Sequence, residues 1–272
     1  MIYLLDQVTK HYGTREGPVR ALDNVSFSVN YGERVALIGK SGVGKTTLFR
    51  LLNATLRPTS GVLRFDGSEV RQMTWRELRL MRRTVGTVYQ QHYLVPSLTV
   101  MDNALCGKLG QWSFWQTLRG TIRPSKLDLR EAEHVLESVG LADKRQARAD
   151  TLSGGQQQRL AIARVLMQSP EVILADEPVA SLDPSLADSI INLLLKLADE
   201  GKRTLVVALH DLDLALRYFP RIVALSQGSL AFDAETACLS RTTLDEFYSR
   251  DRAVLTPPID TKDESSGLRC SC

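Results

Sequence analysis

Apolar and polar residues alternate with a two-residue period through much of the first third of the chain, which predicts β-strands. The alternation is weak over residues 2–8 and clear over 19–29, and a turn is expected at 11–13 between these two strands. The apolar run within 34–38 predicts a short buried strand, and 62–67 predicts an edge strand that ends in a glycine turn. An N-terminal β-rich region is therefore expected.

The period becomes helical in the middle of the chain. A helix is expected over 75–83 and a strand over 85–89, and the stretch 94–149 is expected to be mostly helical. Residues 129–139 show this most clearly, because their apolar side chains recur about every 3.6 residues. The stretch 107–124 is irregular, and its aromatic residues serve either local packing of an insertion or contact with a partner. These residues are Trp112, Phe114 and Trp115.

Helices alternate with apolar runs after residue 152. Short continuous apolar runs predict strands that are covered on both faces, which is typical of a parallel sheet in an α/β protein. The expected helices are 159–166, 186–197 and 212–218, and the expected strands are 172–175, 204–209 and a last strand at 222–225.

The composition is that of an ordinary globular protein. Its 272 residues suffice for one large α/β domain or two small ones, with 43% hydrophobic and 24% charged residues. A net charge of +3 without a long basic block argues against nucleic acid as a partner. No apolar run approaches the ~18 residues of a membrane span, and residues 1–6 lack the features of a signal peptide. We therefore expect a cytosolic protein whose membrane contact, if any, is peripheral or through a partner.

The tail 257–272 is polar and charged, and it is expected to be disordered. The four cysteines show no framework spacing, and reduced thiols are expected in the cytosol. The two tail cysteines could bind a metal or carry a lipid, but neither is expected, because two thiols alone do not complete a stable metal site. The cysteines are Cys106, Cys238, Cys270 and Cys272.

A phosphate-binding loop is the strongest motif. Residues 39–46 match G-x-x-x-x-G-K-[ST] and lie between the strand 34–38 and a helix expected at 47–52, which is the context that the motif requires. Glycine permits the backbone turn that points N–H groups at an anion, and the helix N-terminus adds partial positive charge. Lys45 is expected to reach the β- and γ-phosphates, and Thr46 to ligate Mg²⁺. The candidate nucleotide-binding residues are Gly39, Lys40, Ser41, Gly42, Val43, Gly44, Lys45, Thr46 and Thr47.

Two carboxylates, Asp176 and Glu177, end a buried apolar strand downstream of this loop. Adjacent carboxylates repel each other, and a cation relieves the repulsion. We expect Asp176 to act on the Mg²⁺ of a nucleotide and Glu177 to polarise the attacking water. A second anion site is indicated at 152–156, where a serine and two glycines open a helix, although a plain helix cap is the alternative.

The ordered set of motifs resembles the ATP-binding subunits of ABC transporters over residues 1–233. Beyond the phosphate loop, the resemblance rests on Tyr12, Gln90, the segment 152–156, the pair Asp176-Glu177 before Pro178, the segment 181–183 and His210. It implies an α/β fold: a P-loop NTPase (RecA-like) core with an N-terminal antiparallel β subdomain and an inserted α-helical subdomain at about 91–155. The whole ABC domain is expected to span 1–256.

The resemblance also implies roles that the residues alone do not. ATP and Mg²⁺ are the implied cofactors, held between two subunits of a homodimer or pseudo-dimer arranged head to tail. Tyr12 stacks on adenine, Gln90 touches Mg²⁺ or the water, and His210 holds the γ-phosphate and Glu177. The residues implied to act across the dimer are Ser153, Gly154, Gly155, Gln156 and Asp183.

Three stretches, 103–117, 163–178 and 216–225, are similar to phosphonate-import ATPases. The similarity implies integral-membrane permease subunits, an indirect periplasmic binding protein and a place at the cytoplasmic face of the inner membrane. Importers of phosphite or phosphate, and exporters or lipoprotein-release complexes, are the alternatives. A non-transport ATPase acting on DNA or ribosomes predicts a long coiled-coil insertion or two cassettes, and a single phosphate loop argues against it.

Overall fold

The computed structural model describes residues 1–14, 17–112, 124–180, 182–239 and 247. The chain divides into two compact units, Met1–Ala237 and Cys238–Cys272, and the first contains both sheets. Among the described residues, no helix is long and apolar enough to cross a membrane. Several predictions lie outside the described residues and stay predictions: the domain boundary at 256, the tail 257–272 with Cys270 and Cys272, Phe114 and Trp115, and residue 181 of the segment 181–183.

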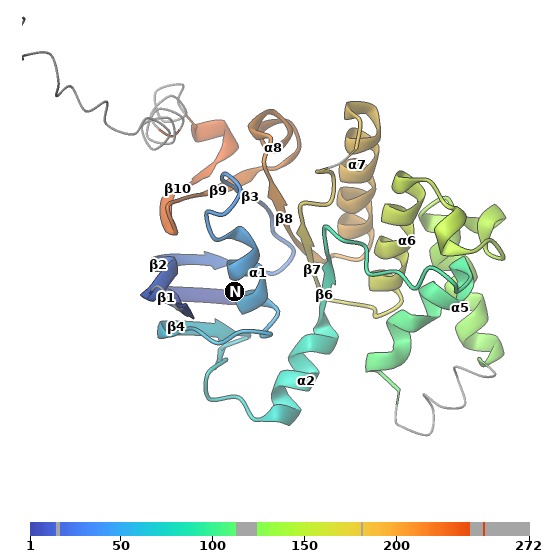
Figure 1. Ribbon diagram of the computed structural model, residues 1–272, viewed down its shortest axis with the longest axis horizontal. Helices are drawn as coiled ribbons and strands as arrows, with labels where there is room; N and C mark the ends of the chain where they lie inside the picture. The colour runs from blue at the N-terminus through green and yellow to red at the C-terminus, as the bar shows by residue number, and fades with distance from the viewer. Residues whose placement is uncertain (15–16, 113–123, 181, 240–246, 248–272) are drawn as a thin grey trace, which may run out of the picture. The chain divides into compact units, whose positions relative to one another are not determined.

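The first part of the chain forms an antiparallel sheet of four strands in the order β2-β1-β4-β5 (Figure 1). The strands are β1 at Tyr3–Thr14, β2 at Gly17–Val29, β4 at Ser60–Phe65 and β5 at Ser68–Glu69.

Two predictions for this sheet are wrong. Residues 11–13 lie within β1 rather than in a turn, because the pairing with β2 continues to Gly13↔Pro18. Register shifts in that pairing interrupt the alternation of apolar residues, which concealed the strand. The strand expected at 62–67 is not an edge strand along its whole length, since β5 pairs with Arg64 and Phe65.

The second sheet has six strands in the order β10-β9-β3-β8-β7-β6. All neighbours are parallel except β9 and β10, so the carboxyl ends of five strands meet at one edge. The strand expected at 222–225 is not the last, because Gln227 and Gly228 both have positive φ and turn the chain into β10. The strands are β3 at Arg34–Ile38, β6 at Val85–Val88, β7 at Val172–Asp176, β8 at Thr204–Leu209, β9 at Arg221–Ser226 and β10 at Ser229–Glu235.

The helices pack on both faces of this sheet. The first, α1, lies between the two sheets, whereas α6 and α7 lie on the other side of the larger one (Figure 1). The α-helices are α1 at Lys45–Leu52, α2 at Trp75–Thr84, α3 at Val100–Leu105, α5 at Lys126–Ser138, α6 at Gly154–Leu166, α7 at Pro184–Glu200 and α8 at Leu212–Tyr218. The 3₁₀-helices are η1 at Cys106–Gly110, η2 at Ala142–Lys144, η3 at Ala149–Thr151 and η4 at Thr236–Cys238.

The helix α1 is anchored in the core between the two sheets. Leu48 and Leu52 of α1 are fully buried in a cluster that takes Tyr3 from the small sheet and Leu174 from the large one. The Tyr3 hydroxyl also donates a hydrogen bond of 2.9 Å to the carbonyl oxygen of Leu52. Apolar burial stabilises by about 25 cal/mol per Å². This packing therefore fixes the helix that begins with the last two residues of the phosphate loop, Lys45 and Thr46.

A buried amide organises the turn before α3. Asn103 is 0% exposed, and its Oδ1 accepts a hydrogen bond from the N–H of Val95. Its Nδ2 donates to the carbonyl oxygens of Val95, Leu98 and Thr99 at 3.0–3.3 Å. The side chain therefore satisfies backbone groups that the turn leaves unpaired.

Replacing Asn103 by Ala should lower the free energy of unfolding by about 3 kcal/mol, because buried backbone groups lose their partners. Urea denaturation followed by circular dichroism measures this change. Asn30→Ala is the matched control, since Asn30 is exposed. Equal denaturation midpoints for the two variants would contradict the prediction.

Candidate active site

The phosphate loop joins the end of β3 to the start of α1. Its glycines have positive φ, with Gly39 at 151°, Gly42 at 81° and Gly44 at 111°. A Cβ atom at Gly39 would lie 2.6 Å from the carbonyl oxygen of Leu225, and one at Gly44 would lie 2.5 Å from that of Ala21. Backbone conformation and space therefore both require glycine at these two positions, and the loop amides can turn toward an anion.

Lys45 lies at the centre of the site and is 3% exposed. Its Nζ donates hydrogen bonds to the carbonyl oxygens of Gly39, at 2.5 Å, and Lys40, at 3.0 Å. The same atom lies 3.3 Å from Oε1 of Glu177 and 3.3 Å from Nδ1 of His210. Burial lowers the pKa of Lys45, and the Glu177 carboxylate opposes that shift.

Glu177 and His210 meet at the carboxyl edge of the parallel sheet. Glu177 follows β7, His210 follows β8, and these strands pair directly. Oε2 of Glu177 lies 2.6 Å from Nε2 of His210. In the neutral tautomer that carries its proton on Nε2, His210 donates to Glu177 and accepts from Lys45. The resemblance implied that His210 holds Glu177, and the structure adds Lys45 to that pair in one cluster, the Lys45–Glu177–His210 cluster.

The backbone of Glu177 is strained. Its φ of 51° is in the left-handed region, which side chains other than glycine seldom adopt. Such conformations are concentrated at functional sites, where the surrounding structure holds them in place. Here the strain turns the carboxylate toward Lys45 and His210.

Asp176 has the properties of a cation ligand. The residue is 6% exposed, and its Oδ1 has no hydrogen-bond partner among the described residues. Burial raises the pKa of Asp176, and a hydrogen bond from the Thr46 side chain lowers it. A buried carboxylate with one unpaired oxygen beside a hydroxyl fits a hard cation such as Mg²⁺, which prefers oxygen ligands.

Gln90, the third predicted metal ligand, is placed at the same edge of the sheet. It lies two residues beyond β6, and β6 pairs with β7 as far as Val88↔Ala175. The residue is exposed, and its contact with a cation or a water stays a prediction.

Sequence reasoning missed two residues that hold the loop after Gln90. Arg164 of α6 donates hydrogen bonds to the carbonyl oxygens of His92, at 2.8 Å, and Tyr93, at 2.5 Å. Gln158 of the same helix is 1% exposed, and its Nε2 has no hydrogen-bond partner among the described residues. Burial lowers the pKa of His92, and the Gln158 side chain opposes that shift. A buried glutamine in a helix among apolar residues was the available signal, since buried polar side chains need partners.

Tyr12 lies beside the first turn of α1. Its hydroxyl is 3.4 Å from that of Thr47, and Nζ of Lys10 lies 5.7 Å from the centre of its ring. An aromatic ring at this position can stack on a base attached to phosphates in the loop. The stacking role stays a prediction.

The segment 152–156 opens α6, with Ser153 as its N-cap and a capping box formed with Gln156. Ser153 and Gly154 are exposed, whereas a Cβ atom at Gly155 would lie 2.5 Å from Leu186. Among the described residues, no hydrogen bond or ion pair joins Ser153 to the Lys45–Glu177–His210 cluster. The amides of Ser153 and Gln156 are paired within the capping box, and an anion site at this helix start stays a prediction.

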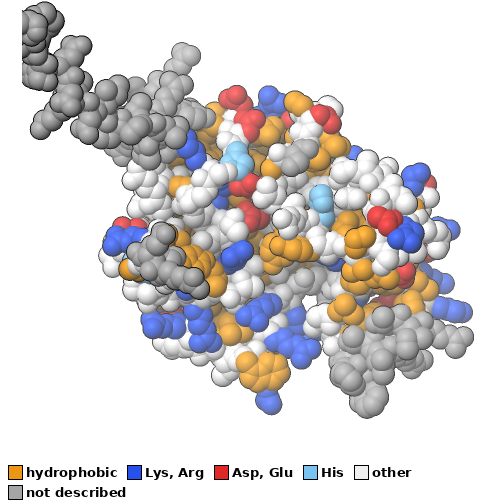
Figure 2. Space-filling view, in the orientation of Figure 1, with side chains coloured by type: hydrophobic (Ala, Val, Ile, Leu, Met, Phe, Trp, Pro, Cys, Tyr) orange, Lys and Arg blue, Asp and Glu red, His pale blue; other side chains and the backbone are white. Residues whose placement is uncertain are grey.

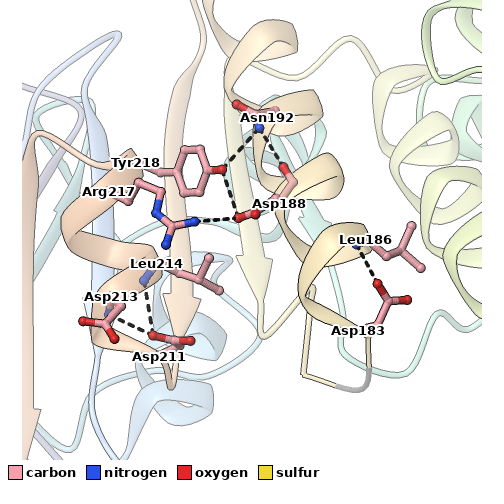
Figure 3. Close-up of polar contacts among 9 residues, drawn as sticks. All are labelled: Asp183, Leu186, Asp188, Asn192, Asp211, Asp213, Leu214, Arg217 and Tyr218. Atoms are coloured by element: carbon pink, nitrogen blue, oxygen red, sulfur yellow. Dashed lines mark hydrogen bonds and ion pairs between the residues drawn. The ribbon is translucent and has the colours of Figure 1, made fainter.

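Asp183 caps α7. Its Oδ1 accepts a hydrogen bond from the hydroxyl of Ser185 at 2.7 Å. The same atom accepts one from the N–H of Leu186 at 3.0 Å (Figure 3). These hydrogen bonds lower the pKa of Asp183. The structure thus gives Asp183 a helix-capping role, and its action across a dimer stays a prediction.

A groove of about 590 Å³ separates α2 and β6 from α6 and η1. Among the described residues, its lining includes four arginines and no carboxylate, and the arginines are Arg79, Arg82, Arg83 and Arg164. Figure 2 shows Lys and Arg side chains gathered over α2. Trp75, also in the lining, is 66% exposed. The groove is suited to an apolar segment that carries negative charge.

Comparison with known proteins places these features in a family. The model of the ABC transporter family matches residues 22–180. The chain is 46% identical over 245 residues to a phosphonates import ATP-binding protein of Anaeromyxobacter dehalogenans, covering 90% of this chain but about half (48%) of that relative. It is 39% identical to one of a Synechococcus strain, covering 97% and 96% of the two chains. A dimeric ATP-binding cassette solved in a post-hydrolysis state with ADP and Pi has a TM-score of 0.74 at 33% identity, covering 86% of this chain and 99% of that one.

Proposed function

Because this chain belongs to the ABC transporter family, we propose that it hydrolyses ATP to drive phosphonate import. The observation that carries the proposal is the Lys45–Glu177–His210 cluster beside the phosphate loop. The names of its relatives support phosphonate as the cargo. The residues of this site act on ATP and carry no information about the cargo.

ATP hydrolysis at this site needs mainly positioning and charge stabilisation. The loop amides and Lys45 bind the β- and γ-phosphates, and Tyr12 stacks on adenine. Glu177 orients a water and accepts its proton as the water oxygen bonds to the γ-phosphorus and the bond to the β-phosphate oxygen breaks. His210 holds Glu177 and contacts the γ-phosphate, and Gln90 contacts the Mg²⁺ or the water. ADP and inorganic phosphate are the products.

Asp176 and Thr46, with Gln90, are the residues that would hold Mg²⁺. When bound, the ion supplies positive charge against the β- and γ-phosphates. The unpaired Oδ1 of Asp176 supports this assignment.

We infer a homodimer in which each phosphate loop faces the α6 N-terminus of the other subunit. The exposed Ser153 and Gly154, and the neighbouring Gly155, form an anion site that the single chain does not use. Gln156 fixes this turn through the capping box, and Asp183 holds the start of α7 near the interface.

The arginine-lined groove is our candidate for the permease contact. Exposed Trp75 and four arginines offer apolar area and positive charge for a cytoplasmic segment of a membrane subunit. The protein is then peripheral at the cytoplasmic face of the inner membrane, and a periplasmic binding protein acts through the permease.

Lys45→Ala should weaken ATP binding by roughly 10- to 100-fold, because charge-assisted hydrogen bonds contribute about 1.5–3 kcal/mol. Calorimetric titration measures the affinity, and Lys202→Ala, an exposed residue beyond α7, is the control. Unchanged affinity in Lys45→Ala would contradict the site.

The cargo is tested in cells that depend on this chain. Deleting its gene should abolish growth on a phosphonate as sole phosphorus source, and wild-type but not Lys45→Ala protein should restore it. Growth on phosphate is the control. Loss of growth on phosphite in place of phosphonate would assign the other cargo and overturn this part of the proposal.

A further inference from the structure

Helices α7 and α8 each connect the active site to a contact between the two helices. The helix α8 begins at Leu212, two residues after His210. The helix α7 begins at Pro184, directly after Asp183, which lies six residues beyond Glu177. A cleft of about 380 Å³ lies between them, and its lining includes Glu177, His210, Asp188 and Arg217. The spacing of the two helices therefore sets the width of a cleft that contains two residues of the active-site cluster.

A hydrogen bond joins the two helices across this cleft (Figure 3). The hydroxyl of Tyr218, the last residue of α8, donates to Oδ1 of Asp188 in the second turn of α7 at 2.9 Å. Asn192, one turn further along α7, donates to the Asp188 carbonyl oxygen at 2.9 Å and lies 3.4 Å from the Tyr218 hydroxyl. Asn192 thus gives the Tyr218 hydroxyl a second contact, whereas it meets Asp188 only at the backbone.

The adjacent ion pair contributes less. Arg217 lies 3.4 Å from the same Asp188 oxygen, but its side chain is 60% exposed and that of Asp188 is 36% exposed. Solvent screens such a pair, and exposed ion pairs typically contribute little. The Tyr218–Asp188 hydrogen bond, which is shorter than the ion pair and partly buried, is therefore the main tie between the helices.

The start of α8 passes this constraint to His210. Oδ1 of Asp211 accepts hydrogen bonds from the N–H groups of Asp213, at 2.8 Å, and Leu214, at 3.2 Å, so the residue after His210 is fixed to the first turn. The helix has only seven residues, about 10 Å in length. A displacement at Tyr218 therefore moves the backbone of His210.

His210 needs such support. Its side chain is 36% exposed, so packing does not hold the ring on every side, while its bond to Glu177 is 2.6 Å long. Small misplacements of reacting groups can reduce rates greatly. We propose that Tyr218 and Asp188 are positioning residues, whose hydrogen bond fixes α8 against α7 and thereby holds His210 on Glu177. This inference rests on the proposed ATPase function.

The test compares steady-state ATP hydrolysis by four variants of the full chain. Tyr218→Phe and Asp188→Ala should each lower kcat on the order of 10-fold, with KM for ATP within about 2-fold of wild type, because the phosphate loop is untouched. The double variant should be no slower than either single variant, since both remove the same bond. Asp188→Asn keeps an acceptor oxygen for Tyr218, and it should restore kcat to within about 2-fold of wild type.

Arg217→Gln is the matched control and should leave kcat within about 2-fold of wild type. Thermal unfolding of every variant separates positioning from folding. A purely structural role would lower Tm and the amount of folded protein, but it would leave kcat per folded chain unchanged. Wild-type kcat in folded Tyr218→Phe would overturn the inference. Equal loss of kcat in Asp188→Asn and Asp188→Ala would also overturn it, because charge would then act rather than the hydrogen bond.

The proposed function fails separately. If the folded wild-type chain hydrolyses no ATP, the proposed function is wrong. If folded Glu177→Gln hydrolyses ATP as fast as wild type, the role of Glu177 is wrong and the positioning role fails with it, while the ATPase function stands. If Glu177→Gln is inactive while Tyr218→Phe retains full kcat, only the positioning role is wrong.

Discussion

Glu177→Gln should lower kcat for ATP by about 10³-fold while ATP still binds, because a positioned general base contributes about 10²–10⁴-fold. The amide keeps the size of the carboxylate but cannot accept the proton of the attacking water. Lys45 and the loop amides remain in place, so binding should persist and the ATP-bound dimer should accumulate. Phosphate release and size-exclusion chromatography at saturating ATP measure the two effects.

The matched control is Glu171→Gln. Glu171 is exposed and lies at the opposite, amino end of β7, so its replacement should leave hydrolysis unchanged. Wild-type turnover in Glu177→Gln would show that another group activates the water, and the assignment of Glu177 would be lost.

Ser153→Arg should abolish dimer formation and lower hydrolysis by about 100-fold or more, because it places bulk and a cation where the N-terminus of α6 meets the partner's phosphates. The phosphate loop of the same chain is unchanged, so ATP binding to the single chain should survive. Ser68→Arg is the control, since Ser68 is exposed on β5 of the small sheet. Full hydrolysis by Ser153→Arg would contradict the head-to-tail arrangement.

Mixing two inactive variants tests the arrangement more sharply. A heterodimer of Ser153→Arg and Lys45→Ala chains has one site with both lesions and one site with neither. Some ATP-dependent dimer should therefore return on mixing, although hydrolysis stays low if both sites must work. If no dimer forms from folded variants at saturating ATP, the two sites are not shared between subunits.

Local features were predictable because a few adjacent residues determine them. The loop at 39–46 needs glycines for its positive φ angles, and these glycines are visible in the sequence. Apolar runs predicted the buried strands, as in Thr204–Leu209, where every residue is buried. Ser153 followed by Gln156 forms a capping box, and these residue types alone indicated a helix start.

The sequence analysis failed where a strand depends on a distant partner. Residues 11–13 extend β1 only because β2 pairs with them, and register shifts remove the alternation that would reveal it. The strand Ser229–Glu235 shows a weak pattern, and it exists because the turn at Gln227 and Gly228 brings it back against β9. Pairing energy, rather than the propensity of the segment itself, decides such elements.

The sequence by itself thus determined the phosphate loop, the residue types of the site and the α/β class, since each follows from local backbone requirements or from periodicity. Only the tertiary structure decided that Lys45, Glu177 and His210 touch, because that depends on the strand order β3-β8-β7. Apolar runs such as those of β7 and β8 are interchangeable in a sequence, so they do not encode which strand is the neighbour. The Tyr218–Asp188 hydrogen bond likewise cannot be predicted from the sequence. It forms because two helices, each fixed by its own packing on the sheet, bring the Tyr218 hydroxyl within 2.9 Å of Oδ1 of Asp188.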